Sequence, residues 1–388
     1  MGVVLAPDLD LFSDEVLLDP YPAYQVLRDL GVVETRRYGV WIVSRDAHVR
    51  EVLKDWHTYS SAWGTAIDPG VNGLRATNII STDPPAHDEL RDVLAPQMSA
   101  RSVRELQGRI DQVAADLVDG LLETGGGDVV ARLAQPLPLR IVGDLVGFAE
   151  EGREGLLEWV DASFNTFGPM NQRTRESIPK LESIWEYLDT MATRERLAPG
   201  GLGAAIHDAK DQGRISADQC RSLLFAYATA GIDTTVNAIS SAVWLLARFP
   251  DQWSMLRSDP SLVSGAANEV LRVESPIQSF TRLARVTGRL GDTIVPRGSR
   301  VLVLFGSANR DERKWQDPAR FDVGRAAADH VAFGYGVHSC AGQFLAKAEL
   351  QGVLRALVER VSTIRLVSAE RKLHNVLRGF RHLDVVLG

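Results

Sequence analysis

Most of the chain carries residue patterns that are typical of helices. Prolines and acidic residues mark several helix starts, where a missing N–H or a negative charge is tolerated best. Val40–Val43 is instead a short β-rich run, which predicts a strand. Residues 60–80 are glycine-rich and irregular. The segments predicted to be helical are 20–28, 46–53, 83–91, 259–276 and 341–361.

The longest helical pattern is also the most apolar. It starts in a capping box at Ser216 and continues to Phe249, with Pro250 as its expected stop. Between Ser222 and Ala247 the only charged residue is Asp233. An apolar run of this length is also the usual sign of a membrane span. Because the run contains several hydroxyl and amide side chains, we interpret it as a buried central helix.

The middle of this helix is expected to be interrupted. Gly231 weakens the helix locally, and the hydroxyl of Thr234 can bond to a backbone carbonyl or to a guest water. A buried carboxylate such as Asp233 is costly unless it is paired or used. One interpretation is an opening that serves chemistry. The other is a capped kink with a satisfied core aspartate.

Composition narrows the class of protein. The 388 residues are 45% hydrophobic, which is sufficient for a large core, and the net charge of -7 argues against a general nucleic-acid binder. The two cysteines, Cys220 and Cys340, do not form a disulfide framework, so a reducing compartment fits. The apolar run at the N-terminus is too short for a signal peptide or an anchor. We therefore expect a cytoplasmic protein without a membrane segment.

Cys340 ends a loop punctuated by glycines, Phe333–Gly342, and the next segment is predicted to be helical. A cysteine at a helix start lies near unpaired N–H groups and the positive end of the helix dipole, which favour a thiolate. A thiolate held in this way is a good axial ligand for haem iron. The alternative is a structural cysteine beside a glycine-rich turn.

The loop reads Phe-Gly-x-Gly-x-His-x-Cys-x-Gly, which resembles the haem-binding loop of the cytochrome P450 superfamily. The resemblance covers nearly the whole chain and favours the soluble bacterial class I type, which depends on ferredoxin. It implies a mainly α fold in a single domain, 1–388, with small β-sheets. Haem would lie between a long central helix and the cysteine-ligand loop. The β-richer part is expected at about 30–60, 280–305 and the C-terminal strands, and the helical part at about 83–275 and 341–361.

The resemblance also assigns roles to residues. Asp233, Thr234 and Gly231 would form the acid–alcohol site that handles dioxygen and protons. His87 and Arg91 are four residues apart and share a helical face, where an arginine fork suits a haem propionate; by themselves they could equally be a solvated surface pair. The full set implied to bind haem is His87, Arg91, Arg282, Phe333, His338, Cys340 and Gly342, with Cys340 as the iron ligand.

A structural triad is implied as well. Glu269 and Arg272 are three residues apart on a predicted helix, a spacing that is common and worth only about 0.2–0.5 kcal/mol by itself. It resembles the Glu-x-x-Arg signature of the family. The third member would be Arg320, in Pro318-Ala-Arg-Phe321. The triad would hold the haem loop in place.

Substrate class is read from a closer resemblance, to bacterial enzymes that O-demethylate para-substituted benzoates. Phe164, Phe167 and Phe280 would form an aromatic box around a small ring. The arginine and serine that hold a carboxylate in that subfamily are replaced here, which favours a neutral phenol; Arg75 keeps an acid substrate open. The residues expected to line the pocket are Leu74, Thr77, Phe164, Phe167, Phe225, Ala226, Ala230, Phe280 and Leu377.

The expected function is therefore a haem-thiolate monooxygenase that hydroxylates or O-demethylates a small aromatic or other apolar compound. It would use haem b and O2, with NAD(P)H acting only through a separate reductase. A [2Fe-2S] or similar ferredoxin would dock near Arg101 and Arg104, and the chain is expected to be a monomer that binds neither nucleic acid nor membrane. The alternatives are a hydroxylase of a terpenoid or polyketide intermediate, a peroxide-driven enzyme and a haem sensor without catalysis.

Overall fold

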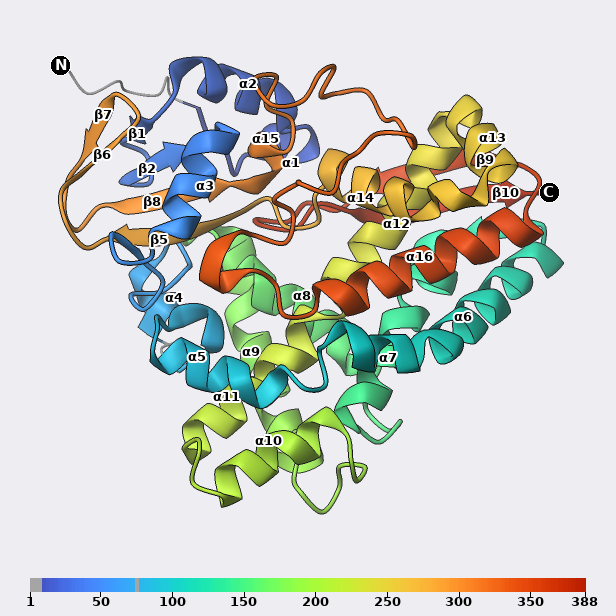
Figure 1. Ribbon diagram of the computed structural model, residues 1–388, viewed down its shortest axis with the longest axis horizontal. Helices are drawn as coiled ribbons and strands as arrows, with labels where there is room; N and C mark the ends of the chain where they lie inside the picture. The colour runs from blue at the N-terminus through green and yellow to red at the C-terminus, as the bar shows by residue number, and fades with distance from the viewer. Residues whose placement is uncertain (1–8, 74–76) are drawn as a thin grey trace.

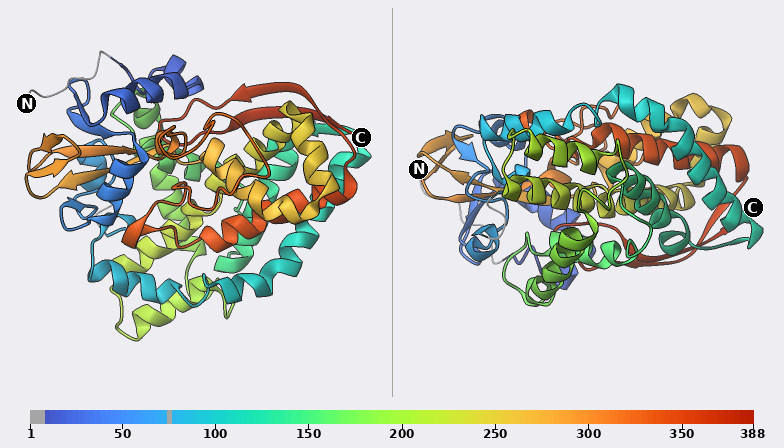
Figure 2. Two further views of the ribbon diagram at one scale, coloured as in Figure 1. Left: turned by 45° about the horizontal axis from the view of Figure 1, so that its top comes forward. Right: turned by 90° about the horizontal axis from the view of Figure 1, so that it is seen from below.

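The computed structural model describes residues 9–73 and 77–388, which fold into a broad and rather thin body (Figures 1 and 2). Most strands gather at the end near the N-terminus, and helices fill the rest. This confirms the expected fold class, mainly α with small sheets. The helices are α1 (Asp14–Leu18), α2 (Tyr21–Leu30), α3 (Asp46–Lys54), α4 (Pro69–Gly73), α5 (Ala86–Leu94), α6 (Ala100–Glu123), α7 (Pro136–Val146), α8 (Gly155–Asn165), α9 (Gln172–Met191), α10 (Leu202–Asp211), α11 (Ala217–Ala230), α12 (Asp233–Arg248), α13 (Pro250–Ser258), α14 (Val263–Val273), α15 (Phe305–Ala308) and α16 (Gln343–Arg360).

The strands in the described part of the chain form three small sheets. The five-stranded sheet has the order β1-β2-β8-β5-β3, in which only β2 and β8 pair in parallel. The others are a three-stranded sheet, β4-β10-β9, and the hairpin β6-β7. The strands are β1 (Val33–Thr35), β2 (Val40–Val43), β3 (Tyr59–Ser60), β4 (Gly126–Asp128), β5 (Ser279–Ala284), β6 (Gly288–Leu290), β7 (Thr293–Val295), β8 (Arg300–Leu304), β9 (Ile364–Arg371) and β10 (Phe380–Leu387).

The long apolar pattern forms two helices, α11 and α12, which meet at Gly231 and Ile232. The capping box at Ser216 is present, with both of its hydrogen bonds to Gln219. Pro250 does more than end this run, since it also occupies the first turn of α13. Within the described parts of the chain, no helix combines the length and apolarity that crossing a membrane requires.

A buried ion pair joins α14 to the long loop that precedes α16. Arg272 donates to both carboxylate oxygens of Glu269, at 2.7 and 2.8 Å, and both side chains are fully buried. Arg272 also donates to the backbone carbonyls of Asn309 and Pro318, each at 2.8 Å. The expected pair is therefore present, and it anchors the loop mainly through backbone carbonyls.

The third arginine at this site differs from the one expected. Arg325 Nε lies 3.1 Å from Glu269 Oε1, whereas the Arg320 side chain is exposed and its nearest acid is Asp322 at 4.0 Å. Arg320 contributes its carbonyl, which accepts from Arg272 Nη2 at 3.2 Å. A tight turn at residues 317–320 points this carbonyl inward and the side chain outward. The assignment of the Arg320 side chain to the triad is thus wrong for this structure.

Arg325→Ala should lower the free energy of unfolding of the haem-loaded protein by about 2–3 kcal/mol, because it removes a charged hydrogen bond from a buried carboxylate. Arg320→Ala is the matched control, and it should change stability by less than about 0.5 kcal/mol since its side chain is exposed. Urea unfolding followed by tryptophan fluorescence measures both. Equal losses in the two variants would contradict this account of the triad.

Candidate active site

A cavity of about 260 Å3 lies in the interior, between the α11–α12 junction and the Cys340 loop. Strand β5 and helices α5, α7 and α8 close its sides. Its lining is mostly apolar. Within residues 9–73 and 77–388, the lining side chains that carry a charge or a titratable group are His87, Arg91, Tyr227, Arg282, Tyr335, His338, Cys340 and Glu349.

The Cys340 loop is shaped by glycines and by backbone hydrogen bonds. Gly334 and Gly336 have φ values of 72° and 73°, which favour glycine. A Cβ on Gly336 would also lie only 2.6 Å from the Leu53 carbonyl at the end of α3. The Cys340 N–H donates to the Phe333 carbonyl at 2.9 Å, which closes the loop. Cys340 is thereby held at the cavity wall, two residues before the N-cap of α16.

The surroundings of the Cys340 thiol have opposing effects on its pKa. Burial raises its pKa, while the Gly342 N–H, which donates to the sulfur, and the charge of Arg91 oppose this rise. The N–H group near the helix start therefore does favour the thiolate, as the sequence predicts, but burial raises the pKa by more than this N–H group lowers it. A coordinated metal ion deprotonates a thiol outright, so the loop needs a metal partner to hold a thiolate.

Basic groups gather at one end of the cavity. The rings of His87 and His338 meet edge to face at 4.4 Å, and burial together with Arg282, His87 and Arg91 lowers the pKa of His338 to about 2. Burial also lowers the pKa of Arg282 to about 10, partly offset by Asp83. Among the described residues, neither Arg91 nor Arg282 has an ion pair, and His338 Nε2 has no hydrogen-bond partner. This end of the cavity is therefore suited to bind anionic groups.

The opposite wall is the junction of α11 and α12. The Thr234 hydroxyl donates to the Ala230 carbonyl at 2.8 Å, across the interruption. A Cβ on Gly231 would lie 3.0 Å from Val142 on α7, so a small residue permits this packing. Ala230, Gly231 and Thr234 all line the cavity. The structure therefore brings the expected alcohol to the wall that faces Cys340.

Two acids near this junction, Asp233 and Glu349, have raised pKa values. Burial raises the pKa of Asp233 to about 7, the charge of Lys372 opposes the rise, and the nearby carboxylate of Asp161 adds to it. Glu349, on α16, lines the cavity, and burial raises its pKa to about 8, with the Thr235 hydroxyl opposing. Asp233 itself is not among the residues that line the cavity, and the charged groups that act on it are Lys372 and Asp161.

Aromatic rings form a row along one side of the cavity. Phe164 and Phe167 lie 6.1 Å apart, Phe167 and Phe280 5.0 Å, and Phe280 and Phe305 6.0 Å between ring centroids. Phe164, Phe280 and Phe305 line the cavity, and Phe167 packs behind them. Phe280 and Arg282 reach it from the same face of β5, as two residues at a spacing of two must. Phe305 was missed from the sequence because it lies where β8 passes into α15.

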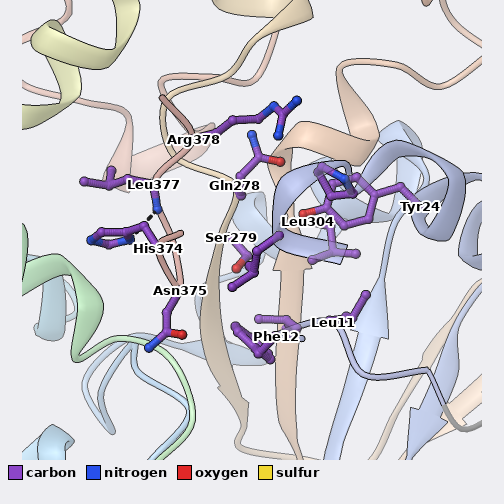
Figure 3. Close-up of a pocket in the computed structure, with 13 residues that line it drawn as sticks. Leu11, Phe12, Tyr24, Gln278, Ser279, Leu304, His374, Asn375, Leu377 and Arg378 are labelled. Carbon is purple, nitrogen blue, oxygen red and sulfur yellow. Dashed lines mark hydrogen bonds between the residues drawn. The ribbon is translucent and has the colours of Figure 1, made fainter. Parts of the chain in front are cut away.

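The remaining residues expected in the pocket are spread more widely. Ala226 and Ala230 line the large cavity, and Thr77 donates to the Ser222 hydroxyl at 3.1 Å outside it. Phe225 stacks on Trp185 at 4.4 Å. Leu377 lines a separate cavity of about 20 Å3 behind β5 (Figure 3). Leu74, like Arg75, lies outside the described residues.

Comparisons with known proteins settle the family. The cytochrome P450 family model matches residues 170–378. Cytochrome P450 CYP199A2 of Rhodopseudomonas palustris is 38% identical over 389 residues, covering 98% of this chain and 93% of that protein. The chain belongs to the cytochrome P450 family.

Two further proteins that are similar to this P450 are named for different compounds. 6-Deoxyerythronolide B hydroxylase of Saccharopolyspora erythraea is 32% identical, covering 97% of this chain and 98% of that protein. A solved structure, cytochrome P450 CREJ in complex with (4-ethylphenyl) dihydrogen phosphate, superposes with a TM-score of 0.88 at 26% identity, covering 98% and 99% of the two chains. This P450 is accordingly a monooxygenase that uses haem b and O2, with electrons that originate at a reductase.

The cavity of this P450 fits haem b. A cysteine faces it from one wall and apolar side chains surround it. At its basic end, Arg91 and Arg282 have no ion pair among the described residues, which suits the two propionates. Cys340 would bind the iron, and Arg91, Arg282, His87 and His338 would hold the propionates. Tyr227 and Glu349 also line the cavity and were not found from the sequence. The signal for Glu349 was an acid on the otherwise apolar face of the predicted helix 341–361.

Proposed function

We propose that this P450 hydroxylates or O-demethylates a small neutral aromatic compound with electrons supplied by a ferredoxin. The observation that carries the proposal is the segregation of charge in the cavity. Among the described residues, the two arginines that line the cavity lie at the basic end suited to the propionates, and the aromatic row borders the rest. A buried carboxylate without a partner is costly, whereas an aromatic ring gains contact with the row.

The residues of the chain would divide the work. Haem b, when bound, supplies the activation of O2 and the oxygen insertion. Phe164, Phe280 and Phe305 would exclude water and orient a ring, because offset and edge-to-face contacts favour particular ring positions. The Thr234 hydroxyl, released from the Ala230 carbonyl, would donate a hydrogen bond into the cavity. Asp233 would supply the protons that the reduction of O2 to water requires.

Two of the similar proteins support an aromatic substrate. This chain shares 38% identity with CYP199A2 and resembles the benzoate O-demethylase subfamily in sequence. CREJ binds a compound that carries a 4-ethylphenyl ring. The second candidate, a polyketide hydroxylase, is favoured by the likeness to 6-deoxyerythronolide B hydroxylase.

The substrate class is tested by titrating the ferric protein with 4-ethylphenol, guaiacol, 4-methoxybenzoate and a monoterpene, and following the low-to-high-spin shift of the Soret band. The phenols should give a strong shift and the benzoate none. Phe280→Leu should weaken 4-ethylphenol binding about threefold to tenfold, the worth of an aromatic contact of about 0.5–1.5 kcal/mol.

The control for this titration is Phe148→Leu, which alters a buried aromatic contact with Tyr187 outside the cavity and should leave 4-ethylphenol affinity unchanged. A strong shift with the benzoate would overturn the neutral-substrate proposal. A shift with the monoterpene alone would overturn the aromatic one.

The ferredoxin part of the proposal rests on the surface around α16. Helix α6 packs along α16, which leads away from the Cys340 loop (Figure 1). Arg101 and Arg104 project from the first turns of α6 and are exposed, and Arg101 has only a weak ion pair with Glu105, at 3.6 Å. Tyr335 and Phe344, on either side of Cys340, are exposed as well. An acidic ferredoxin would find cations and apolar contacts there.

The double variant Arg101→Glu, Arg104→Glu should raise the ferredoxin concentration for half-maximal NADH oxidation about tenfold at low ionic strength, and less in high salt. Arg36→Glu, Arg297→Glu makes the same change of net charge with exposed residues at the β-rich end, and should have little effect. If both double variants behave alike, the α6 site is not where ferredoxin docks.

A further inference from the structure

The turn between α8 and α9, residues 166–171, is held by side-chain amides at both of its ends. Asn171 caps the start of α9, because its Oδ1 accepts the Thr174 N–H at 3.1 Å. Its Nδ2 donates to Asn375 Oδ1, on the segment between β9 and β10, at 2.8 Å. At the other end of the turn, Asn165 Oδ1 accepts the Asn375 N–H at 3.0 Å. We refer to Asn165, Asn171 and Asn375 as the amide cluster.

Asn375 is the member of the amide cluster that joins the two ends of the turn. Its Nδ2 donates to the Asn165 carbonyl at 2.9 Å and to Asn171 Oδ1 at 3.2 Å. Asn375 and Asn165 are 2% and 7% exposed, and an unpaired amide in such a place is costly. A Cβ on Gly168 would lie only 2.5 Å from Asn375 Cβ, so the backbone of the turn packs directly against this side chain. A displacement of the turn would therefore break several buried hydrogen bonds.

Asn375 is also fixed to the strand that carries Phe280. The carbonyl of the next residue, Val376, accepts the Gln278 N–H at 2.8 Å, immediately before β5. The Val376 N–H donates to His374 Nδ1 at 3.0 Å, which fixes the shape of this segment. Figure 3 shows Asn375 and Gln278 bordering the same small cavity behind β5. The amide cluster thus connects the α8–α9 turn to β5.

This connection spans the two sides of the aromatic row. Phe167, in the α8–α9 turn, packs 5.0 Å from Phe280 on β5, measured between ring centroids. A second connection between these two sides uses backbone groups. The Phe167 carbonyl accepts the Ile67 N–H at 3.1 Å, and the Thr281 N–H donates to the Thr65 carbonyl at 2.9 Å. Of the two connections, the amide cluster is the one made by side chains, so it is the one that a substitution can alter.

We propose that Asn375, through the amide cluster, determines how broad a compound the large cavity accepts. The cluster holds Phe164 and Phe167 at a fixed separation from Phe280, and Phe164 and Phe280 line that cavity. A flat ring fits beside a row held in this way, whereas a broader compound requires the α8 side to move outward. Asn375 acts through the rings and is a positioning residue. The inference rests on the proposed function, in which the row contacts the substrate.

The proposal is tested with two imidazoles that bind to the haem iron, because their affinity reports the room beside the row whatever the natural substrate is. 4-Phenylimidazole carries one flat ring, and 1-(diphenylmethyl)imidazole carries two rings on one carbon. The shift of the Soret band on nitrogen ligation gives both dissociation constants. The readout is their ratio, the Kd of the diphenylmethyl compound divided by that of 4-phenylimidazole.

Asn171→Ser is the main variant. Serine keeps the N-cap bond to Thr174, while the amide that donates to Asn375 is lost. Asn375→Ala opens the cluster from the other side and keeps the Cβ that packs on Gly168. Each variant should lower the ratio about threefold or more, because contacts between rings depend on ring position. A merely structural loss would weaken both imidazoles alike and leave the ratio unchanged.

The matched control is Asn268→Ala on α14. It removes the same amide, which there donates to the Ser264 carbonyl and lies outside the linings of both cavities. This variant should keep the wild-type ratio. A wild-type ratio in haem-loaded Asn171→Ser would overturn the proposal, and this variant alone decides if Asn375→Ala fails to fold.

A titration of the same samples with 4-ethylphenol separates this inference from the proposed function. If 4-ethylphenol shifts the spin state of the wild type but the imidazole ratio is the same in all variants, the inference fails and the proposed function stands. If the ratio falls in the cluster variants while no phenol shifts the spin state of the wild type, the amide cluster keeps its role and the aromatic substrate fails.

Discussion

The buried guanidinium of Arg272 connects the helical core to the loop that presents Cys340. Its bonds to Glu269 fix it on α14, and its bond to the Asn309 carbonyl ties down the segment after α15. Asn309 then accepts the Val331 N–H at 2.7 Å, and the Val331 carbonyl accepts the Gly334 N–H. A continuous set of hydrogen bonds thus leads from a charge in the core to the cysteine loop. Removing one partner of such a buried pair costs about 3–5 kcal/mol, so the position of the thiol depends on this interaction.

A second constraint acts on the opposite wall. The α11–α12 junction lines the cavity, although it lies in the most apolar helical stretch of the chain. The helical hydrogen bonds are interrupted at this junction, and the Thr234 hydroxyl donates instead to the Ala230 carbonyl. Asp233 is not among the residues that line the cavity, and the charged groups that act on it are Lys372 and Asp161. The same short segment therefore provides a polar group to the cavity and, beside it, a buried acid whose pKa is raised.

The sequence predicted those features that depend on local pattern. The capping box at Ser216, the strand Val40–Val43 and the helix after Cys340 need only neighbouring residues, and all three are present. The triad failed at Arg320 because two arginines five residues apart lie in an irregular loop, where no period decides which side chain turns inward. Phe305 and Lys372 reach their sites by long-range packing. No spacing in the chain indicated that Lys372 would meet Asp161, more than two hundred residues earlier.

The central claim is that Cys340 holds haem iron as a thiolate in the cavity opposite Thr234. The most direct measurement is the absorption spectrum of the dithionite-reduced protein with carbon monoxide, for the wild type and for Cys340→His. A thiolate ligand donates electron density strongly, so the wild-type Soret band should lie at the long wavelength that is characteristic of haem-thiolate proteins. Cys340→His should bind haem at the same basic end and move the band to the shorter wavelength of a histidine-ligated haem. The same short-wavelength band in both proteins would contradict the account.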